Sequence, residues 1–202
     1  GSATVAEAGA VKQPPASGER LGVEEAIAFW DERHRQHGEL RSGGDLTYDH
    51  ATNEAFYALR LGQLLDILGA SASAVAPLRL LDAGCGKGWF TRALTRCGHK
   101  VDGIDASTAA VEECRRLTVG TDRYTVDRLD SWAPTYLYDA VVTVDVLFHL
   151  MDDAVWRDSV VNLAALAVRR PAGAHRPRWR DGPPVGGVPG DQVTAGLPRR
   201  GA

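Results

Sequence analysis

The stretch LLDAGCGKGWF, from Leu80 to Phe90, constrains the fold of this chain more than any other segment. An apolar run ends in the carboxylate of Asp82, three glycines follow at alternate positions, and an amphipathic helical pattern begins at Trp89. A strand that turns through glycines into a helix presents unpaired backbone N–H groups at the helix N-terminus. Glycine permits the unusual backbone angles of such a turn and lets a ligand approach the backbone closely. The stretch therefore predicts a nucleotide-type site at the carboxyl end of a buried strand.

Apolar runs of strand length alternate with helical patterns from residue 78 to residue 167. Such alternation indicates a parallel sheet whose two faces are covered by helices. The predicted fold class is therefore α/β, a doubly wound parallel sheet. We expect strands at Leu78–Ala83, Lys100–Ile104, Arg123–Val126 and Tyr138–Val146, and helices at Trp89–Arg96, Thr108–Leu117 and Asp153–Ala167.

Four regions are expected along the 202 residues. Residues 1–20 begin with a Gly-Ser pair that resembles the remnant of a cleaved tag, and their small and polar composition predicts a disordered arm. Residues 21–77 are expected to form a helical cap or lid, and residues 78–167 the sheet domain. Residues 168–202 are rich in Arg, Pro and Gly without periodicity, which predicts a disordered tail. Within the cap we expect helices at Val23–His37 and Asn53–Leu68, the second ending at Gly69.

Charge and cysteine content argue against several kinds of partner. The segment from Val168 onward holds seven arginines and two aspartates, a net +5, so the remainder of this chain of net charge −3 carries −8. An acidic body disfavours nucleic acid as a partner. The sequence has no apolar run of 18 residues and no charged-then-apolar start, so we expect neither a membrane span nor a signal peptide. Three cysteines without C-x-x-C spacing predict free thiols in a reducing cytoplasm and no metal site.

The glycine pattern itself distinguishes between classes of nucleotide. A phosphate-binding G-x-x-x-x-G-K-[ST] loop is excluded because Lys87 is followed by Gly88. A dinucleotide fingerprint requires a small residue where this chain has Trp89, which leaves a dehydrogenase as a distant alternative. Asp82 would repel a pyrophosphate, but it suits a ligand that carries an ammonium or sulfonium charge. S-adenosylmethionine (SAM) carries both charges.

The segment Asp82–Gly88 resembles the first motif, D/E-x-G-x-G-x-G, of class I SAM-dependent methyltransferases. The resemblance covers about residues 46–167, and it implies a Rossmann-like fold with SAM as cofactor and S-adenosylhomocysteine as product. Asp105, 17 residues after Gly88, matches the acid that accepts hydrogen bonds from both ribose hydroxyls. An acid after the third strand is expected to accept from the adenine amine, and both Asp127 and Asp130 remain open for this role. The cofactor contacts that the resemblance implies are Asp82, Ala83, Gly84, Cys85, Gly86, Gly88, Asp105, Ala106, Asp127, Asp130 and Val144.

Three further residues are candidates for the chemistry or for closing the site. His149, just past the fourth strand, is placed to act as general base for a hydroxyl acceptor, or else only fixes the loop there. Asp145 lies at the strand end that the family uses for backbone contacts to the cofactor. Tyr48 precedes the first strand, where the N-terminal helices of the family close over SAM. We expect Trp30 and His34 to be helix-face residues.

The methyl acceptor is expected to be a small molecule, such as a natural product or a sugar. No [DNS]-P-P-[YFW] motif follows the fourth strand and no Pro-Cys nucleophile is present, so the nucleic-acid signatures of the family are missing. The abundance of Arg, Ala, Gly and Pro suggests a GC-rich bacterial gene.

The chain departs from the family pattern after residue 167. The family sheet has seven strands in the order 3-2-1-4-5-7-6, and strands 5–7 are not recognisable in residues 168–202, which prolines interrupt. The fourth strand would then be an unpaired edge, which favours a homodimer or a partner chain that completes the sheet. The abrupt change in composition raises the hypothesis of a reading-frame slip, with a natural half-length protein as the alternative. Two functions remain open: a small-molecule methyltransferase, and a truncated, non-catalytic SAM-binding scaffold that acts through association.

Overall fold

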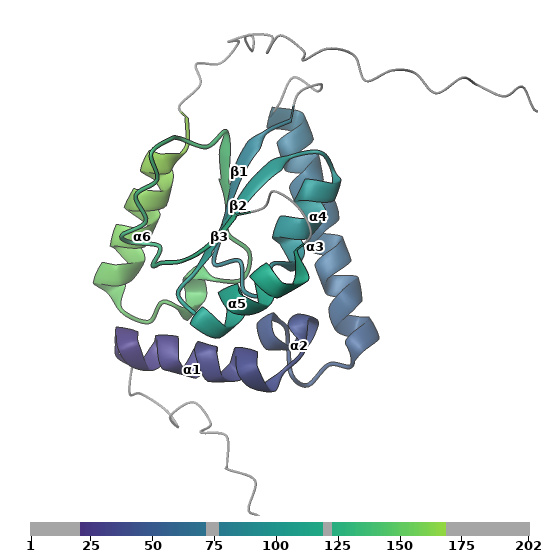
Figure 1. Ribbon diagram of the computed structural model, residues 1–202, viewed down its shortest axis with the longest axis vertical. Coiled ribbons are helices and arrows are strands. Elements are labelled where there is room, and N and C mark those ends of the chain that lie inside the picture. The colour runs from purple at the N-terminus through teal and green to yellow at the C-terminus, as the bar shows by residue number, and fades with distance from the viewer. Residues whose placement is uncertain (1–20, 72–76, 119–122, 169–202) are drawn as a thin grey trace, which may run out of the picture.

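A four-stranded parallel sheet forms the centre of the computed structural model, which describes residues 21–71, 77–118 and 123–168 (Figure 1). The strand order is β3-β2-β1-β4, so β1 has a neighbour on each side. Leu80 of β1 lies opposite Val101 of β2 and Ala140 of β4. The strands are β1 (Arg79–Ala83), β2 (Lys100–Asp105), β3 (Arg123–Val126) and β4 (Ala140–Val142).

Helices cover both faces of this sheet, which confirms the predicted fold class. Figure 1 shows α6 on one side of the strands, and α3 and α4 on the other. Successive β1 side chains point to opposite faces, so Leu81 packs with Leu163 of α6 while Leu80 packs with Leu94 of α4 and Leu68 of α3. The helices are α3 (His50–Ser71), α4 (Trp89–Arg96), α5 (Thr108–Leu117), which packs on β2 and β3, and α6 (Asp153–Leu166).

Two further helices lie across the carboxyl ends of the strands, α1 (Val23–Gln36) and α2 (Glu39–Gly43) (Figure 1). Acidic residues in the first turn of α1 and basic residues in its last turn complement the helix dipole. Arg33 of α1 donates hydrogen bonds to the carbonyl oxygens of Ser42 (2.7 Å) and Gly44 (2.5 Å) and so fixes α2 beside α1. The two helices therefore form one unit that covers the carboxyl ends of the strands, where the glycine turn lies.

The outer edge of the sheet beside β4 is paired at one position. The N–H of Tyr138 donates to the carbonyl of Leu166 (2.9 Å), and the N–H of Val168 donates to the carbonyl of Tyr138 (2.8 Å), which forms a parallel bridge to Ala167. Asp139, the next residue, bonds to β1 instead, so Tyr138 directs its backbone groups away from β1. This bridge lies just before β4, and β4 itself pairs only with β1 among the described strands, as expected of an edge strand.

The boundaries of α3 differ from the predicted helix at both ends. The helix begins at His50 rather than at Asn53, because the Asp49 carboxylate accepts a hydrogen bond from the N–H of Thr52 (2.8 Å) and caps the first turn. It continues to Ser71 and does not end at Gly69.

The predicted fourth strand is too long, because β4 ends at Val142 instead of Val146. Val142 lies opposite Asp82, one residue before the end of β1, so β1 offers β4 almost no further residues to pair with beyond that point. The short helix α2 lies between the two helices expected in the cap and was not predicted.

Parts of the sequence predictions fall outside the described residues. These are the arm at residues 1–20 and, beyond residue 168, the tail, the unrecognised strands 5–7 and the reading-frame hypothesis. None of the described helices combines the length and the apolar composition that crossing a bilayer requires.

Candidate functional site

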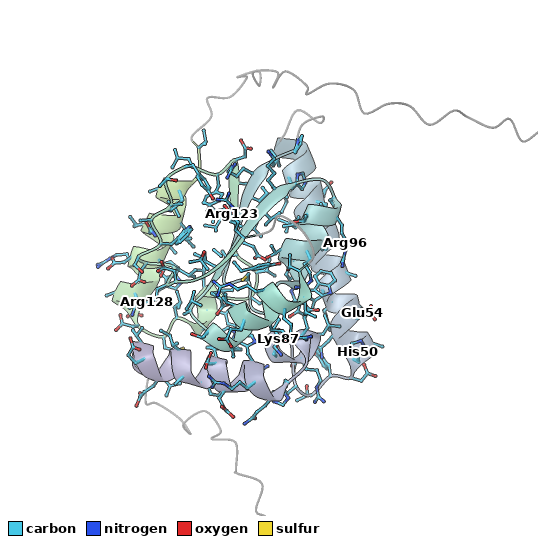
Figure 2. All side chains as sticks on the ribbon, viewed as in Figure 1. His50, Glu54, Lys87, Arg96, Arg123 and Arg128 are labelled. Atoms are coloured by element: carbon cyan, nitrogen blue, oxygen red, sulfur yellow. The ribbon has the colours of Figure 1, made fainter. Side chains whose placement is uncertain are left out.

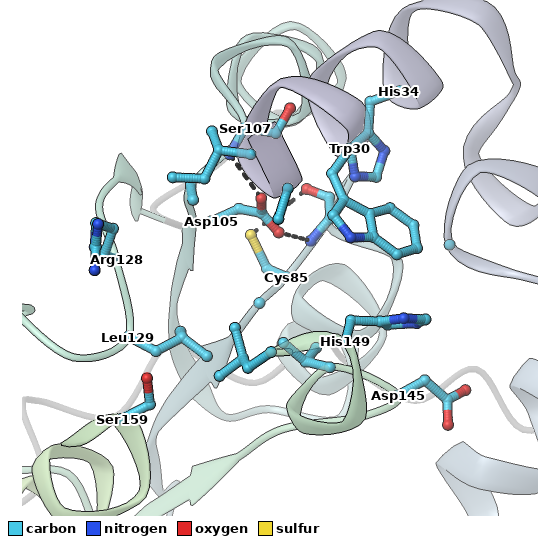
Figure 3. Close-up of a pocket in the computed structure, with 18 of the residues that line it drawn as sticks. Trp30, His34, Cys85, Asp105, Ser107, Arg128, Leu129, Asp145, His149 and Ser159 are labelled. Atoms are coloured by element: carbon cyan, nitrogen blue, oxygen red, sulfur yellow. Dashed lines mark hydrogen bonds between the residues drawn. The ribbon is translucent and has the colours of Figure 1, made fainter. Parts of the chain in front are cut away.

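A pocket lies at the carboxyl ends of the strands, between the glycine turn and α1 (Figure 3). Residues 84–87 follow β1, and residues 105–107 comprise the last residue of β2 and the two residues after it. We call these two segments the loop wall of the pocket. The helix wall consists of the α1 residues Ala26, Ile27, Trp30 and His34. Residues 127–130 after β3 line one end, and residues that follow β4, among them Val144 and Ser159, also line the pocket.

The loop wall is shaped mainly by its own backbone. The N–H groups of Gly84 and Cys85 both donate to the carbonyl of Ile104, at 2.8 and 2.9 Å, and tie the turn to β2. Gly84 and Gly86 have φ angles of 80° and 51°, values that favour glycine. A Cβ on Gly84 would lie 2.5 Å from a methyl of Val146, so the turn also needs glycine for close packing.

Asp105 connects the two halves of the loop wall. Its Oδ2 accepts a hydrogen bond from the N–H of Gly86 (2.8 Å), and its Oδ1 accepts one from the N–H of Ser107 (2.8 Å; Figure 3). Burial raises the pKa of this carboxyl group against the effect of these two bonds. Since an ionised carboxylate oxygen has two lone pairs, each oxygen keeps capacity to accept from a ligand hydroxyl.

The two acidic residues after β3 have different partners. Arg128 donates to both oxygens of Asp130, at 2.9 and 2.6 Å, and lowers its pKa. Asp127 uses Oδ1 to accept from the N–H of Arg128 (2.7 Å) and from the hydroxyl of Ser131 (3.1 Å). No described residue donates to its Oδ2 in this geometry. Asp127 is therefore better placed than Asp130 to accept a hydrogen bond from a ligand.

The segment after β4 carries Val144, Asp145 and His149 into the lining. Asp145 has a φ of 56°, uncommon for a residue other than glycine, and its carboxylate pairs with Arg60 of α3 at 2.8 Å. His149 lies with its ring centre 4.5 Å from that of Trp30. Burial, aided by the charge of Arg33, lowers the pKa of His149, so its imidazole is neutral at pH 7.

The helix wall is held by side chains. Trp30 and His34 lie one helical turn apart on α1 and face the loop wall (Figure 3). His34 is 5 % exposed, and burial together with the charges of Lys87 and Arg33 lowers its pKa to about 4. Its Cε1 would lie 3.5 Å from a Cβ on Gly86, so the ring sits directly against the loop wall.

Ten of the fourteen predicted site residues line the pocket together. Asp82, Ala83, Gly88 and Tyr48 do not. The Asp82 carboxylate is 2 % exposed, accepts the hydroxyl of Thr91 (2.6 Å) and has a pKa raised by burial to about 6. Asp82 therefore does not reach the pocket, and its position does not support the predicted pairing with a positive charge on the ligand. The ten predicted residues that do line the pocket are Gly84, Cys85, Gly86, Asp105, Ala106, Asp127, Asp130, Val144, Asp145 and His149.

Gly88 and Tyr48 have structural positions instead. Gly88, with a φ of 81°, is the N-cap of α4, where a Cβ would come within 2.9 Å of Cys114 Sγ. Tyr48 is 42 % exposed and stacks on Phe56. Tyr57, which is not among the predicted site residues, lines the pocket and stacks on Phe90.

The helix wall was also missed, although α1 itself was predicted. Trp30 and His34 were expected on a helix face, and the signal available was their spacing of four residues. That spacing places both on one side of a helix but does not identify what the side faces. Among the described residues, no group of three or more His, Cys, Asp or Glu side chains is arranged to hold a metal ion.

Residues 80–170 match the family described as "Methyltransferase domain". This segment is similar to the members of that family. The match begins in β1, includes the glycine turn and Asp105, and extends past α6. The matched segment thus supplies the loop wall, while α1 lies before it in the chain.

Two curated relatives are ubiquinone biosynthesis O-methyltransferases. That of Methylocella silvestris is 37% identical over 83 residues, which are 38% of this chain and 32% of the relative. That of Alkalilimnicola ehrlichii is 34% identical over 97 residues, 45% of this chain and 38% of the relative. The chain therefore spans only about a third of the length of these relatives.

Solved structures show a similar fold. The N-methyltransferase NodS from Bradyrhizobium japonicum, in complex with S-adenosylhomocysteine, has a TM-score of 0.53 at 21% identity and covers 69% of this chain and 67% of its own. Magnesium protoporphyrin IX methyltransferase from Synechocystis, with bound SAM, has a TM-score of 0.51 at 22% identity and covers 67% of this chain and 65% of its own. At these identities the likeness establishes the fold alone.

Proposed function

We propose that this pocket binds SAM and that the chain carries the cofactor-binding part of a methyltransferase for small molecules. The observation that carries the proposal is the position of Asp105 against the turn of Gly84 and Gly86 in a pocket of this family's domain. The ribose would lie on Asp105, the methionine portion along the loop wall, and the adenine between Asp127 and Leu129.

The residues present fit this cofactor. A Cβ on Gly86 would contact His34 Cε1 at 3.5 Å, an ordinary van der Waals distance, so the lack of a side chain keeps the backbone of Gly86 accessible to a ligand. Asp105 can still accept from hydroxyls, and Leu129 supplies an apolar surface at the end that Asp127 lines. In Figure 3, Arg128 and Leu129 lie at one end of the pocket, His34 and His149 at the other, and Asp105 between them. An elongated ligand with a ribose at its centre suits that arrangement.

The chemistry that SAM supplies is a methyl group on a sulfonium, ready for in-line displacement. The residues of this chain would position an acceptor, exclude water and, for a hydroxyl acceptor, take up its proton. The neutral imidazole of His149, held against Trp30, is suited to accept that proton. A natural product or a sugar remains the proposed acceptor class, and the free cysteines support a reducing cytoplasm as the location.

Calorimetric titration with S-adenosylhomocysteine tests the proposal. We expect wild-type protein to bind, and Asp127→Asn to weaken binding about 5- to 15-fold, because the neutral amide oxygen that replaces the carboxylate is a weaker acceptor for the adenine amine. Asp130→Asn is the matched control, since Arg128 already occupies both oxygens of Asp130. Its affinity should stay within about twofold of wild type on the same reasoning.

Each result has a distinct meaning. Absence of binding to wild-type protein would overturn the proposed function. A large loss in Asp130→Asn with none in Asp127→Asn would exchange their assigned roles. Binding of S-adenosylhomocysteine without methyl transfer from SAM to any acceptor in a panel of phenols, sugars and amines would favour the non-catalytic scaffold.

A further inference from the structure

Asp31, in the middle of α1, is bound to the N-terminal end of α5. Its Oδ1 accepts hydrogen bonds from the hydroxyl of Ser107 (2.7 Å) and from the N–H of Ala109 (2.8 Å). The side chain is 14 % exposed. Burial alone would raise the pKa of Asp31, but these two bonds and the charge of Arg35 lower it, so the group is an anion at neutral pH. A helix N-terminus is a favourable place for that charge.

The contact continues into the loop wall. Ser107 donates its hydroxyl to Asp31 and its N–H to Asp105, whose other oxygen holds the N–H of Gly86. A single chain of hydrogen bonds thus runs from α1 through Ser107 to the carboxylate assigned to the ribose. Figure 3 shows Ser107 and Asp105 joined in this way below α1.

The other polar contacts of α1 lie towards its ends. Near the C-terminal end, Lys87 donates to the carbonyl of His37 (2.7 Å), and Arg92 pairs with Glu39 just beyond. At the N-terminal end, Arg128 is 3.8 Å from Glu24, whose side chain is 88 % exposed. Figure 2 shows Arg128 near that end of α1. Such an exposed pair contributes little. Asp31 is therefore the strong tether for the part of α1 that covers the pocket.

We propose that Asp31 is a positioning residue: through Ser107 it orients Asp105 for the ribose, and it latches α1 over the bound cofactor. This inference rests on the proposed function. Because α1 forms one wall of the pocket, movement of that wall away from the loop wall would free a bound ligand. The rate of release is then set by how often the Asp31 contacts break.

The latch predicts a specific kinetic change. Asp31→Ala removes the acceptor of two hydrogen bonds to a charged group, so dissociation of S-adenosylhomocysteine should be about 10- to 100-fold faster. Association should be unchanged or faster, since the pocket opens more often. Asp31→Asn keeps an Oδ1 that can accept from both donors, and it should restore most of the slow release.

The experiment measures association and dissociation rates by stopped-flow fluorescence in wild type, Asp31→Ala, Asp31→Asn and Glu32→Ala. Glu32 is the control, because it neighbours Asp31 on α1 and is 55 % exposed. Hydrogen exchange of the α1 amides is recorded in parallel on ligand-free protein. We expect α1 to exchange at least about tenfold faster in Asp31→Ala than in wild type or Glu32→Ala.

The outcomes separate the two proposals. Unchanged exchange of α1 in Asp31→Ala overturns the latch even if no ligand binds. Binding to wild type with the same dissociation rate in Asp31→Ala overturns it as well, as does equal acceleration in Asp31→Asn and Asp31→Ala. Faster α1 exchange in a protein that binds no S-adenosylhomocysteine supports the latch and overturns only the proposed function.

Discussion

The two walls of the pocket are held by different kinds of contact. The loop wall depends on backbone hydrogen bonds from Gly84, Cys85 and Gly86, on glycine φ angles, and on one carboxylate that bonds only to backbone N–H groups. The helix wall depends on side chains that bridge distant parts of the chain, such as Asp31 to Ser107 and Lys87 to His37. The first wall is set by local geometry, and the second by tertiary contacts that can open.

Because of this difference, the loop wall maintains the shape of the pocket, and the helix wall controls the entry and release of a ligand. A wall built of backbone in a fixed turn keeps its shape whether or not a ligand is present. A wall fixed by a few side chains can leave its place at a cost of a few hydrogen bonds, which is the property that ligand exchange requires. The following predictions test that division.

The largest effect is expected from Gly84→Ala in the loop wall. A Cβ there would lie 2.5 Å from Val146 in a residue with φ of 80°, so strain and overpacking together should cost about 2–5 kcal/mol of unfolding free energy. Gly86→Ala is the matched comparison, with positive φ but no atom closer than 3.5 Å, and should cost only about 1–2 kcal/mol. Urea denaturation of both variants measures the difference. Equal losses would mean that packing on Val146 contributes nothing.

A pH dependence is expected from His34 in the helix wall. Its pKa in the folded state is about 4, below the usual 6.5, so the unfolded chain takes up a proton first as the pH falls. Stability present above pH 6.5 is therefore lost between pH 6.5 and 4, by at most about 3 kcal/mol. Denaturation of His34→Gln across this range should show a shallower loss than wild type. His149→Gln, measured beside it, gives the share of the other pocket histidine, whose pKa is lowered in the same direction.

The smallest effect is expected from Lys87→Ala. The variant removes the hydrogen bond from Nζ to the carbonyl of His37, which should cost about 1 kcal/mol and loosen the C-terminal end of α1. The loop backbone should keep its shape, so affinity for S-adenosylhomocysteine should fall only a few-fold. Lys100→Ala, at the exposed start of β2, controls for loss of a positive charge. A loss of affinity greater than about 100-fold would contradict the division between the walls.

The same division explains what the sequence could predict. The strand, turn and helix around Gly84 are local, and the apolar alternation that follows specifies the parallel sheet. Residues that the turn and the strand ends place, such as Asp105 and Asp127, were found because their distance from a strand end is short. Asp82 was assigned to the ligand by its charge, and nothing local indicated that its side chain points to Thr91 in the core.

The helix wall could not be predicted for a physical reason. Asp31 and Ser107 are separated by 76 residues, and an acidic side chain on a helix gives no sign of its distant partner. The periodicity of α1 predicts a helix with a buried side, yet His34 and Trp30 are as compatible with core packing as with a pocket. The start of α3 was misplaced because the cap at Asp49 was not recognised.

The strand order has a consequence for the time at which the pocket forms. β1 is the first strand in the sequence but lies inside the sheet, and its contact with the β4 segment joins residues 60 positions apart. Contacts of such separation close late, and a chain emerging from the ribosome cannot make them until the later partner has been synthesised. The glycine motif is therefore translated well before the segment from Val144 to Ser159 that completes its pocket. A nascent chain that stops before β4 would contain the complete motif and still lack the site.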